Sequence, residues 1–118
     1  MLNRFDQRQI YEACMHACLV AVREGFPHLD IRDIADPPHE WFDAALARQV
    51  VMHLMIRECG WPKRRVVEIE DRSREAINRA LRTIDRRLQT PRFQAHYQTM
   101  KERARALLFI RASETEAA

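Results

Sequence analysis

Residues 48–84 decide how this 118-residue chain folds, and they read Arg48-Gln49-Val50-Val51-Met52-His53-Leu54-Met55, then Gly60-Trp61-Pro62, then Lys63-Arg64-Arg65, and finally Arg72-Ser73-Arg74-Glu75-Ala76-Ile77-Asn78-Arg79-Ala80-Leu81-Arg82-Thr83-Ile84. The pattern predicts the end of one helix, a break at the glycine and proline, a short helix, a turn and a longer helix. A longer helix with one apolar and one basic side completes the parts of a helix-turn-helix. We therefore expect such a unit at about residues 62–88.

The longer helix of this unit is predicted to begin after Ser73, a good N-cap residue, and to reach about Leu88. Apolar residues recur on it at helical spacing and predict a core stripe of Ile77, Leu81, Ile84 and Leu88. The opposite side carries Glu75, Arg79, Arg82 and Arg86, flanked by Asn78. One interpretation of this side is a solvated face with an ion pair from Glu75 to Arg79. The other is a surface that reads DNA bases.

Base reading fits the residue types on that side, because arginine matches guanine, asparagine matches adenine, and glutamate accepts from the cytosine amino group. The candidate base-reading residues are Arg74, Glu75, Asn78, Arg79 and Arg82. Basic residues around the turn and at the helix end are candidates for gripping phosphates: Lys63, Arg64, Arg65, Arg72, Arg86 and Arg87.

Upstream of this unit, a first helix is expected to start at Asp6, with Gln9 completing a capping box. The residues expected to face inward are Ile10, Cys14, Ala17, Cys18, Ala21 and Val22. The helix is expected to end at Gly25, in a left-handed conformation, and Pro27. Residues 30–34 predict a single capped turn with two apolar anchors, Ile31 and Ile34.

A long central helix is expected from about His39 to Cys59, with Pro37 or Pro38 in its first turn and Glu40 and Asp43 at the positive end of its dipole. The residues expected to face inward are Phe42, Ala45, Leu46, Val50, and His53 or Leu54. After Thr90-Pro91 a last helix is expected to run from about residue 91 to 111, with a frayed tail at 113–118. Its apolar stripe is Phe93, Tyr97, Met100, Ala104, Leu107 and Leu108.

Length and composition indicate one globular domain, since 47% of the residues are hydrophobic and 31% are charged. The two glycines are too few for the turns of an all-β fold. We expect an all-α domain of about five or six helices. The net charge of +3 is unevenly distributed, because residues 57–92 hold 11 basic and 6 acidic side chains while residues 1–56 hold 5 and 8. A local basic region is what a nucleic-acid face requires, although solvated helices also carry arginine.

The three cysteines and the charged N-terminus predict a reduced, cytoplasmic setting, because Arg4, Asp6 and Arg8 interrupt any early apolar run. The apolar stretch 17–22 is too short to span a membrane. Cys14 and Cys18 share one helical face while His16 points elsewhere, which is poor geometry for a metal. We expect buried thiols and no metal or cofactor.

The chain resembles a known family, the C-terminal DNA-binding domain of the bacterial chromosomal replication initiator DnaA. The resemblance covers roughly residues 10–110 and depends on Asp33-Ile34, on Ala47-Arg48-Gln49 followed by Met52 and Leu54, and on Ile77, Ala80 and Ile84 in the longer helix. It implies an all-helical fold with a helix-turn-helix that binds duplex DNA.

The departures from this family concern the residues that contact DNA. The family reads Gly-Arg-Asp-His-Thr-Thr or Gly-Arg-Asp-His-Ser-Thr at the turn, where this chain has Asp71-Arg72-Ser73-Arg74-Glu75-Ala76 and only Arg72 matches. The family's basic segment before Arg-Gln is replaced by residues 39–43, which are acidic and aromatic. No Gly-x-x-x-x-Gly-Lys segment is present. The resemblance therefore implies a shared scaffold with an altered sequence preference.

Two functions follow from these patterns. The first is duplex DNA binding by a transcriptional or replication-linked regulator. The second is a protein-protein interaction module that uses the same scaffold and basic face on an acidic partner, with Trp41 and Trp61 as anchors. Ordinary core packing is the competing interpretation of both tryptophans. The scattered histidines form no catalytic pattern, so we do not expect an enzyme. Homodimerisation is left open.

Overall fold

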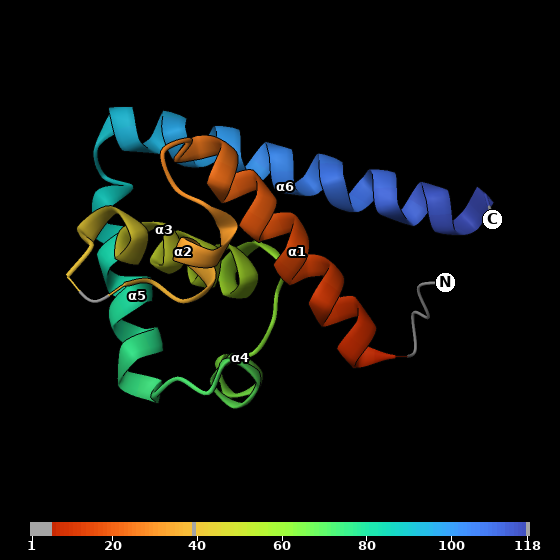
Figure 1. Ribbon diagram of the computed structural model, residues 1–118, viewed down its shortest axis with the longest axis horizontal. Coiled ribbons are helices and arrows are strands. Elements are labelled where there is room, and N and C mark those ends of the chain that lie inside the picture. The colour runs from red at the N-terminus through yellow and green to blue at the C-terminus, as the bar shows by residue number, and fades with distance from the viewer. Residues whose placement is uncertain (1–5, 39, 118) are drawn as a thin grey trace.

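The computed structural model describes residues 6–38 and 40–117, which form six α-helices and no strand (Figure 1). The helices are α1 (Gln7–Gly25), α2 (Ile31–Ala35), α3 (Phe42–His53), α4 (Lys63–Glu70), α5 (Arg74–Arg87) and α6 (Pro91–Ala117), and a π-helical segment, η1 (Leu54–Glu58), continues α3. The predicted all-α class is confirmed. None of the described helices is both long and apolar enough to cross a membrane.

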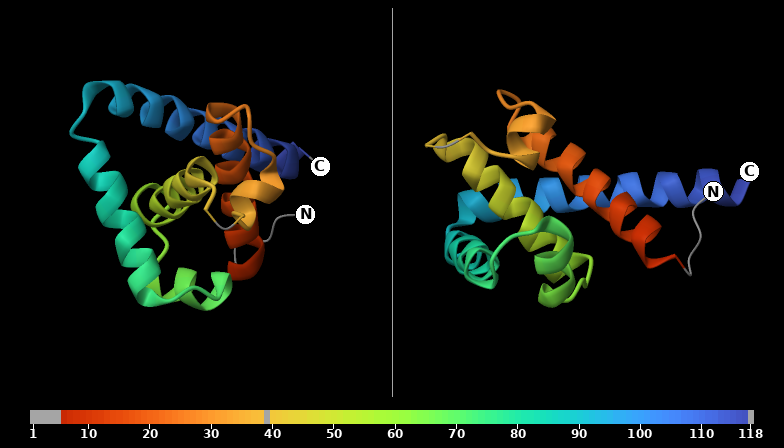
Figure 2. Two further views of the ribbon diagram at one scale, coloured as in Figure 1. Left: turned by 60° about the vertical axis from the view of Figure 1, so that its left-hand side comes forward. Right: turned by 60° about the horizontal axis from the view of Figure 1, so that its bottom comes forward.

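α3 lies at the centre of the molecule, with α1, α5 and α6 around it (Figure 2). Its residues are therefore buried on almost every side, as expected of a helix that is apolar around most of its circumference. α1 runs against α6 on one side of α3, while α5 packs on another side. The core joins residues of all these helices, among them Cys18, Val50, Met55, Ile84 and Met100.

α1 begins as predicted, because the Asp6 carboxylate accepts hydrogen bonds from the backbone N–H groups of Arg8 and Gln9 at 3.0 and 3.2 Å. Its end differs from the prediction. Gly25 is the last helical residue and has no left-handed conformation. A Cβ atom at this position would lie 2.7 Å from Sδ of Met100. The glycine is needed here because α6 passes close to α1, and its carbonyl accepts a hydrogen bond from Nε2 of His96 at 2.8 Å.

The segment from α2 to α3 confirms some expectations and corrects others. Asp30 and Asp33 form the expected capped turn, but of its two anchors only Ile34 is buried, while Ile31 is 40% exposed. α3 begins at Phe42 because Glu40 has a left-handed backbone (φ 71°) and Trp41 is an extended N-cap. The prolines therefore precede the helix, and Glu40 also lies outside it. The predicted start, His39, lies outside the described residues.

Three residues near the start of α3 were assigned to the wrong environment. Phe42 and Ala45 were expected to face inward, but both are exposed, Phe42 by 65%. They lie on the outer side of the first turn, whose inward side carries the fully buried Ala44. Trp41 is 37% exposed, so core packing is the wrong interpretation for it. Leu46, Val50, His53 and Leu54 are buried as predicted.

α6 is longer than predicted. It extends to Ala117, so residues 113–117 are helical and the expected frayed tail is wrong for them. Its apolar stripe is confirmed, with Tyr97, Met100 and Ala104 buried and the other members packed against the core. The far end of α6 extends beyond the other helices (Figure 1). Phe109 is 73% exposed there.

Candidate nucleic-acid interface

The segment from Gly60 to Arg87 forms a short helix, a turn and a longer helix, in the predicted order. Gly60 has a φ of +79°, which allows the chain to leave η1, and Pro62 precedes α4. Asp71 ends α4 in the left-handed region, and Oγ of Ser73 accepts the backbone N–H of Ala76 at 3.0 Å. The predicted N-cap and the bounds of α5 are therefore confirmed. Whether this unit is a DNA-reading helix-turn-helix stays a prediction.

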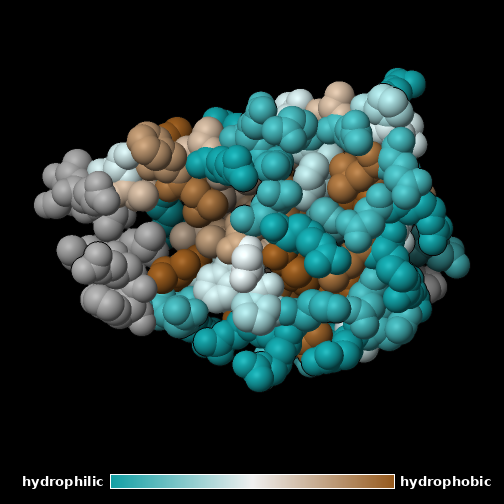
Figure 3. Space-filling view, turned by 180° about the vertical axis from the view of Figure 1, so that it is seen from behind, coloured by the Kyte–Doolittle hydropathy of each residue, from teal (hydrophilic) through white to brown (hydrophobic). Residues whose placement is uncertain are grey.

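α5 has the two faces that its sequence predicts. Ile77, Leu81 and Ile84 are buried, with 3% exposure or less, and Leu88 packs against the core. The opposite face carries Glu75, Arg79, Arg82 and Arg86, all exposed. Seen from behind, hydrophilic residues cover the side of the molecule on which α5 lies (Figure 3). We call these four residues the outer face of α5.

The charges on the outer face are arranged differently from the prediction. Oε1 of Glu75 accepts a hydrogen bond from Nη2 of Arg82 at 3.1 Å, so the expected ion pair with Arg79 is wrong. Arg82 lies seven residues beyond Glu75, so its side chain extends along two helical turns. Within the described part of the chain, Arg79, Arg86 and Arg74 make no ion pair or hydrogen bond through their guanidinium groups. Three cations on α5 are therefore available for a ligand.

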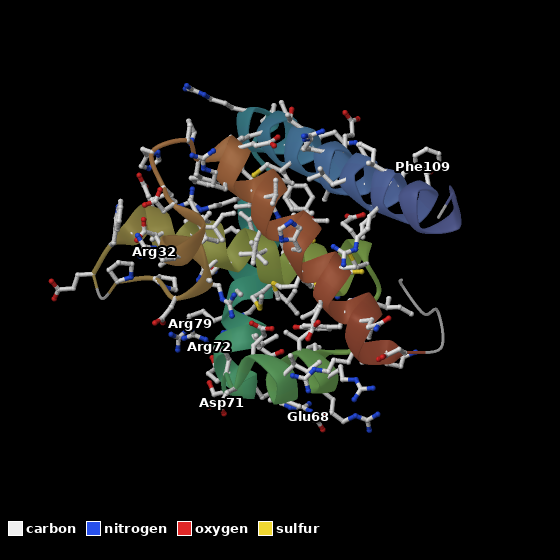
Figure 4. All side chains as sticks on the ribbon, turned by 45° about the vertical axis from the view of Figure 1, so that its right-hand side comes forward. Arg32, Glu68, Asp71, Arg72, Arg79 and Phe109 are labelled. Atoms are coloured by element: carbon white, nitrogen blue, oxygen red, sulfur yellow. The ribbon has the colours of Figure 1, made fainter. Side chains whose placement is uncertain are left out.

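The remaining predicted site residues divide among four places. Arg72 lies in the turn before α5 (Figure 4), and its contact with Asp36 is long, at 3.9 Å. Nζ of Lys63 donates to Oδ1 of Asn78 at 3.2 Å, which joins α4 to the flank of α5. Arg64 and Arg65 are exposed and line a groove between α4 and the start of α1. Arg87 lies 5.7 Å from the ring of Phe42 and 5.9 Å from that of Phe93, away from the outer face.

Two acidic side chains adjoin the site and were not considered in the sequence prediction. Glu68 and Asp71 project from the end of α4 and from the turn (Figure 4), and both are exposed. Neither has an ionic partner among the described residues. They lower the positive potential near Arg72 and would repel phosphates.

A groove of about 470 Å³ adjoins the outer face of α5. Arg72 and Arg79 lie on its α5 side, and Pro38, Glu40 and Ala45 lie on the side of α3 and the segment before it. Met52 and Ile77, which are only 2% exposed, form part of its floor. The sequence did not predict this groove, because the groove depends on how α3 and the segment before it pack against α5.

A buried polar link fixes the end of α4. Glu70 accepts Nη2 of Arg48 at 2.6 Å with one carboxylate oxygen and the hydroxyl of Tyr11 at 2.8 Å with the other. The side chains of Arg48 and Glu70 are only 10% and 15% exposed. Burial, and then the bond to Glu70, raises the pKa of Tyr11 well above its usual value. We call these three residues the Glu70 link. It connects α1, α3 and α4 just before the turn.

A second polar link, the His53 link, holds α5 and α6 to α3. Nε2 of His53 lies 2.7 Å from Oδ1 of Asp85, and Nδ1 lies 2.7 Å from the hydroxyl of Tyr97. An ionised carboxylate only accepts, so in the neutral ring Nε2–H donates to Asp85 and the Tyr97 hydroxyl donates to Nδ1. His53 was one of the residues expected to face inward, and it is 3% exposed. Burial raises the pKa of Tyr97 strongly.

The three cysteines lie together behind this unit. Cys14 and Cys18 are buried as predicted, and Sγ of Cys18 lies 4.0 Å from Sγ of Cys59. A hydrogen bond with Cys14 lowers the pKa of Cys59, but the bond with Cys18 and burial outweigh it and raise that pKa to about 12. No group of His, Cys, Asp and Glu side chains in the described segments has the geometry to hold a metal ion. Trp61 is 9% exposed and packs on Tyr11, which confirms its core interpretation.

Comparisons of the chain with protein-family models, with curated proteins and with solved structures find no match. The resemblance to the DnaA C-terminal domain therefore stays a prediction. A function has to be inferred from the surface of the molecule itself.

Proposed function

We propose that the protein binds duplex DNA by placing the outer face of α5 in the major groove, as a transcriptional or replication-linked regulator. The observation that carries this proposal is an exposed arginine face on a helix whose other face is firmly packed in the core. The major groove, about 12 Å wide, admits one such helix. No other described element covers the outer face, because its residues remain exposed in the whole chain.

The roles proposed for individual residues follow from their positions. Arg79 and Arg74 have no competing partner and would reach base edges directly, while Asn78 and Arg82 would first have to leave Lys63 and Glu75. Glu75 would either accept from a cytosine or hold Arg82 in place. Arg72 and Arg86 would contact phosphates near the two ends of the helix.

The other predicted phosphate contacts have weaker support. Arg64 and Arg65 are exposed on α4, and Arg65 faces α1 rather than α5. Arg87 is occupied by two aromatic rings. Lys63 remains near the flank of α5 through Asn78. We therefore expect fewer phosphate contacts than the six basic residues named from the sequence.

The test is binding of a fluorescent duplex to the full chain, measured by anisotropy over a series of salt concentrations. Replacing both arginines by alanine (Arg79→Ala with Arg82→Ala) should reduce affinity by about tenfold or more, because each good arginine contact contributes ~1–3 kcal/mol. Four phosphate contacts would give a slope of log affinity against log salt of about −3.6, at −0.9 for each contact. Circular dichroism should show an unchanged fold.

The matched control removes the same charge from α6. Arg103 and Arg105 are exposed and pair with Glu24 and Glu58, away from α5. Replacing both by alanine should leave DNA affinity nearly unchanged. Equal losses for the two double variants, or a salt-independent affinity, would end the proposal. Selection of bound duplexes from a random pool would then show whether the chain prefers a sequence.

A second candidate function is binding of an acidic protein partner through the same basic side. The exposure of Trp41 and Phe42 favours it, because aromatic residues beside arginine are common binding anchors. Trp61 is buried and is no longer a candidate anchor. Under this alternative, duplex DNA would not bind to the wild-type chain, whereas under the first proposal Trp41→Ala would leave DNA binding intact.

A further inference from the structure

The groove between α3 and α5 has the size and lining of a small-molecule site. Its volume of about 470 Å³ falls in the range of about 300–1,000 Å³ that ligand pockets occupy. Pro38, Ala45 and Ala76 give it exposed apolar walls, and Met52 and Ile77 close part of its floor. An apolar group of one or two rings would replace water against these walls.

The charged groups on the groove favour an anion. Arg79 has no partner in the described chain, and Arg72 has only its long contact with Asp36, whose side chain is 95% exposed. Such an exposed pair contributes little, so Arg72 is nearly free. Both arginines line the groove, Arg79 from α5 and Arg72 from the turn before it (Figure 4). Against them stands Glu40, also on the groove, while the charge of Arg48 is balanced by Glu70. Asp71, which precedes Arg72 in the turn, also lowers the positive potential there. Among the residues that line the groove, however, Arg72 and Arg79 outnumber the single carboxylate, Glu40.

We infer that this groove binds a small organic anion, with its ring system against the apolar walls and its phosphate or carboxylate group between Arg72 and Arg79. Arginine forks hold both kinds of anion through paired N–H groups. The ligand would occupy two of the cations proposed to contact DNA, so it would compete with DNA. This competition rests on the proposed function, whereas binding of the anion does not.

The experiment titrates the ¹⁵N-labelled full chain with four probes: 1-naphthyl phosphate, 1-naphthoate, 1-naphthylmethanol and inorganic phosphate. At least one of the two aromatic anions should bind saturably and shift the amide signals of residues 72–80. Its affinity should be about tenfold higher than that of the neutral alcohol or of inorganic phosphate, because only the aromatic anions use both the walls and the arginines. The first two probes distinguish a phosphate from a carboxylate ligand.

A filling substitution tests the place of binding without altering charge. Ala45→Trp puts a large ring into the groove from α3, at an exposed position that is not among the residues proposed to contact DNA. This substitution should lower the affinity for the aromatic anion by about tenfold and leave the affinity for DNA unchanged. Ala95→Trp, at an exposed alanine on α6, is the matched control and should change neither.

The outcomes separate the two proposals. Equal affinity of the aromatic anions for wild type and Ala45→Trp, shifts confined to another surface, or no saturable binding would overturn the inference. Displacement of labelled DNA by the aromatic anion, lost in Ala45→Trp, would support it in full. Anion binding at the groove in a chain that does not bind duplex DNA would support the site and overturn the proposed function.

Discussion

Two Glu–Arg pairs, one between α4 and α3 and one within α5, differ in burial, although they contain the same chemical groups. Glu70 and Arg48 are 15% and 10% exposed, whereas Glu75 and Arg82 are 62% and 59% exposed. A buried charge without its partner is costly, while an exposed charge remains solvated when its partner leaves. The first pair therefore holds the α4–α5 unit in place, and the second leaves its arginine free to exchange partners. A buried pair therefore has a structural role, and an exposed pair of the same groups leaves its arginine available for binding.

The largest expected effect comes from removing the partner of the buried arginine. Glu70→Ala leaves Arg48 uncompensated and Tyr11 without its acceptor, and should lower the free energy of unfolding by about 3–5 kcal/mol. The measurement is urea denaturation followed by circular dichroism. Glu68→Ala is the matched control, because Glu68 lies one half-turn earlier on the same helix and is exposed. Similar losses for the two variants would contradict the distinction between buried and exposed charge.

The His53 link should be the next most sensitive place. Tyr97→Phe removes the hydroxyl that donates to Nδ1 of His53 and leaves a buried ring nitrogen unsatisfied. The expected loss is about 1–3 kcal/mol in the free energy of unfolding, measured by the same denaturation. Gln98→Ala, at the next residue on α6, has an exposed side chain and serves as the control. No loss in Tyr97→Phe would mean that His53 is held by Asp85 alone.

Alkaline pH should destabilise the fold through the thiol cluster. The pKa of Cys59 is about 12 in the folded chain, and an unperturbed thiol has a pKa of about 8.5. The folded state thus keeps a proton that the unfolded state releases. This contribution to stability is complete below about pH 8.5 and is lost as the pH rises from there toward the folded value. Cys59→Ala should reduce the decline of the free energy of unfolding between about pH 8.5 and 10. At higher pH the ionisation of the tyrosines also lowers stability. Parallel curves of stability against pH for the wild type and the variant would contradict this role of Cys59.

Periodicity and capping predicted the helices because they depend on residues three or four apart. Ser73 and the stripe of Ile77, Leu81 and Ile84 are found where the sequence places them. The start of α3 was wrong because Glu40, a residue with no special preference, adopts a left-handed backbone. The predicted role of Gly25 was wrong because the need for a glycine there depends on Met100, which is distant in sequence.

The polar contacts of the candidate site were less predictable than its exposure. The outer face of α5 follows from the position of the core stripe, so its arginines could be named. The bonds of Tyr11 and Arg48 to Glu70 join residues 59 and 22 positions apart, and no local pattern marks them. Arg87 belonged to the predicted phosphate contacts, yet it is held by two aromatic rings from α3 and α6. Charge predicts the exposure of the arginines on α5 but not the burial of Arg48, and the choice of partner depends on tertiary packing.

The smallest expected effect on stability is at Glu75, where the comparison of the two pairs is sharpest. Glu75→Gln breaks an exposed ion pair and should change the free energy of unfolding by less than about 0.5 kcal/mol. Its effect on DNA should be larger, because Arg82 loses an anionic competitor. Anisotropy with a random duplex should show a few-fold higher affinity and a steeper salt slope. Glu102→Gln, on an exposed part of α6, removes the same charge and should change neither quantity. Lower affinity in Glu75→Gln would instead mean that the carboxylate itself contacts the bases or holds Arg82 in its reading position.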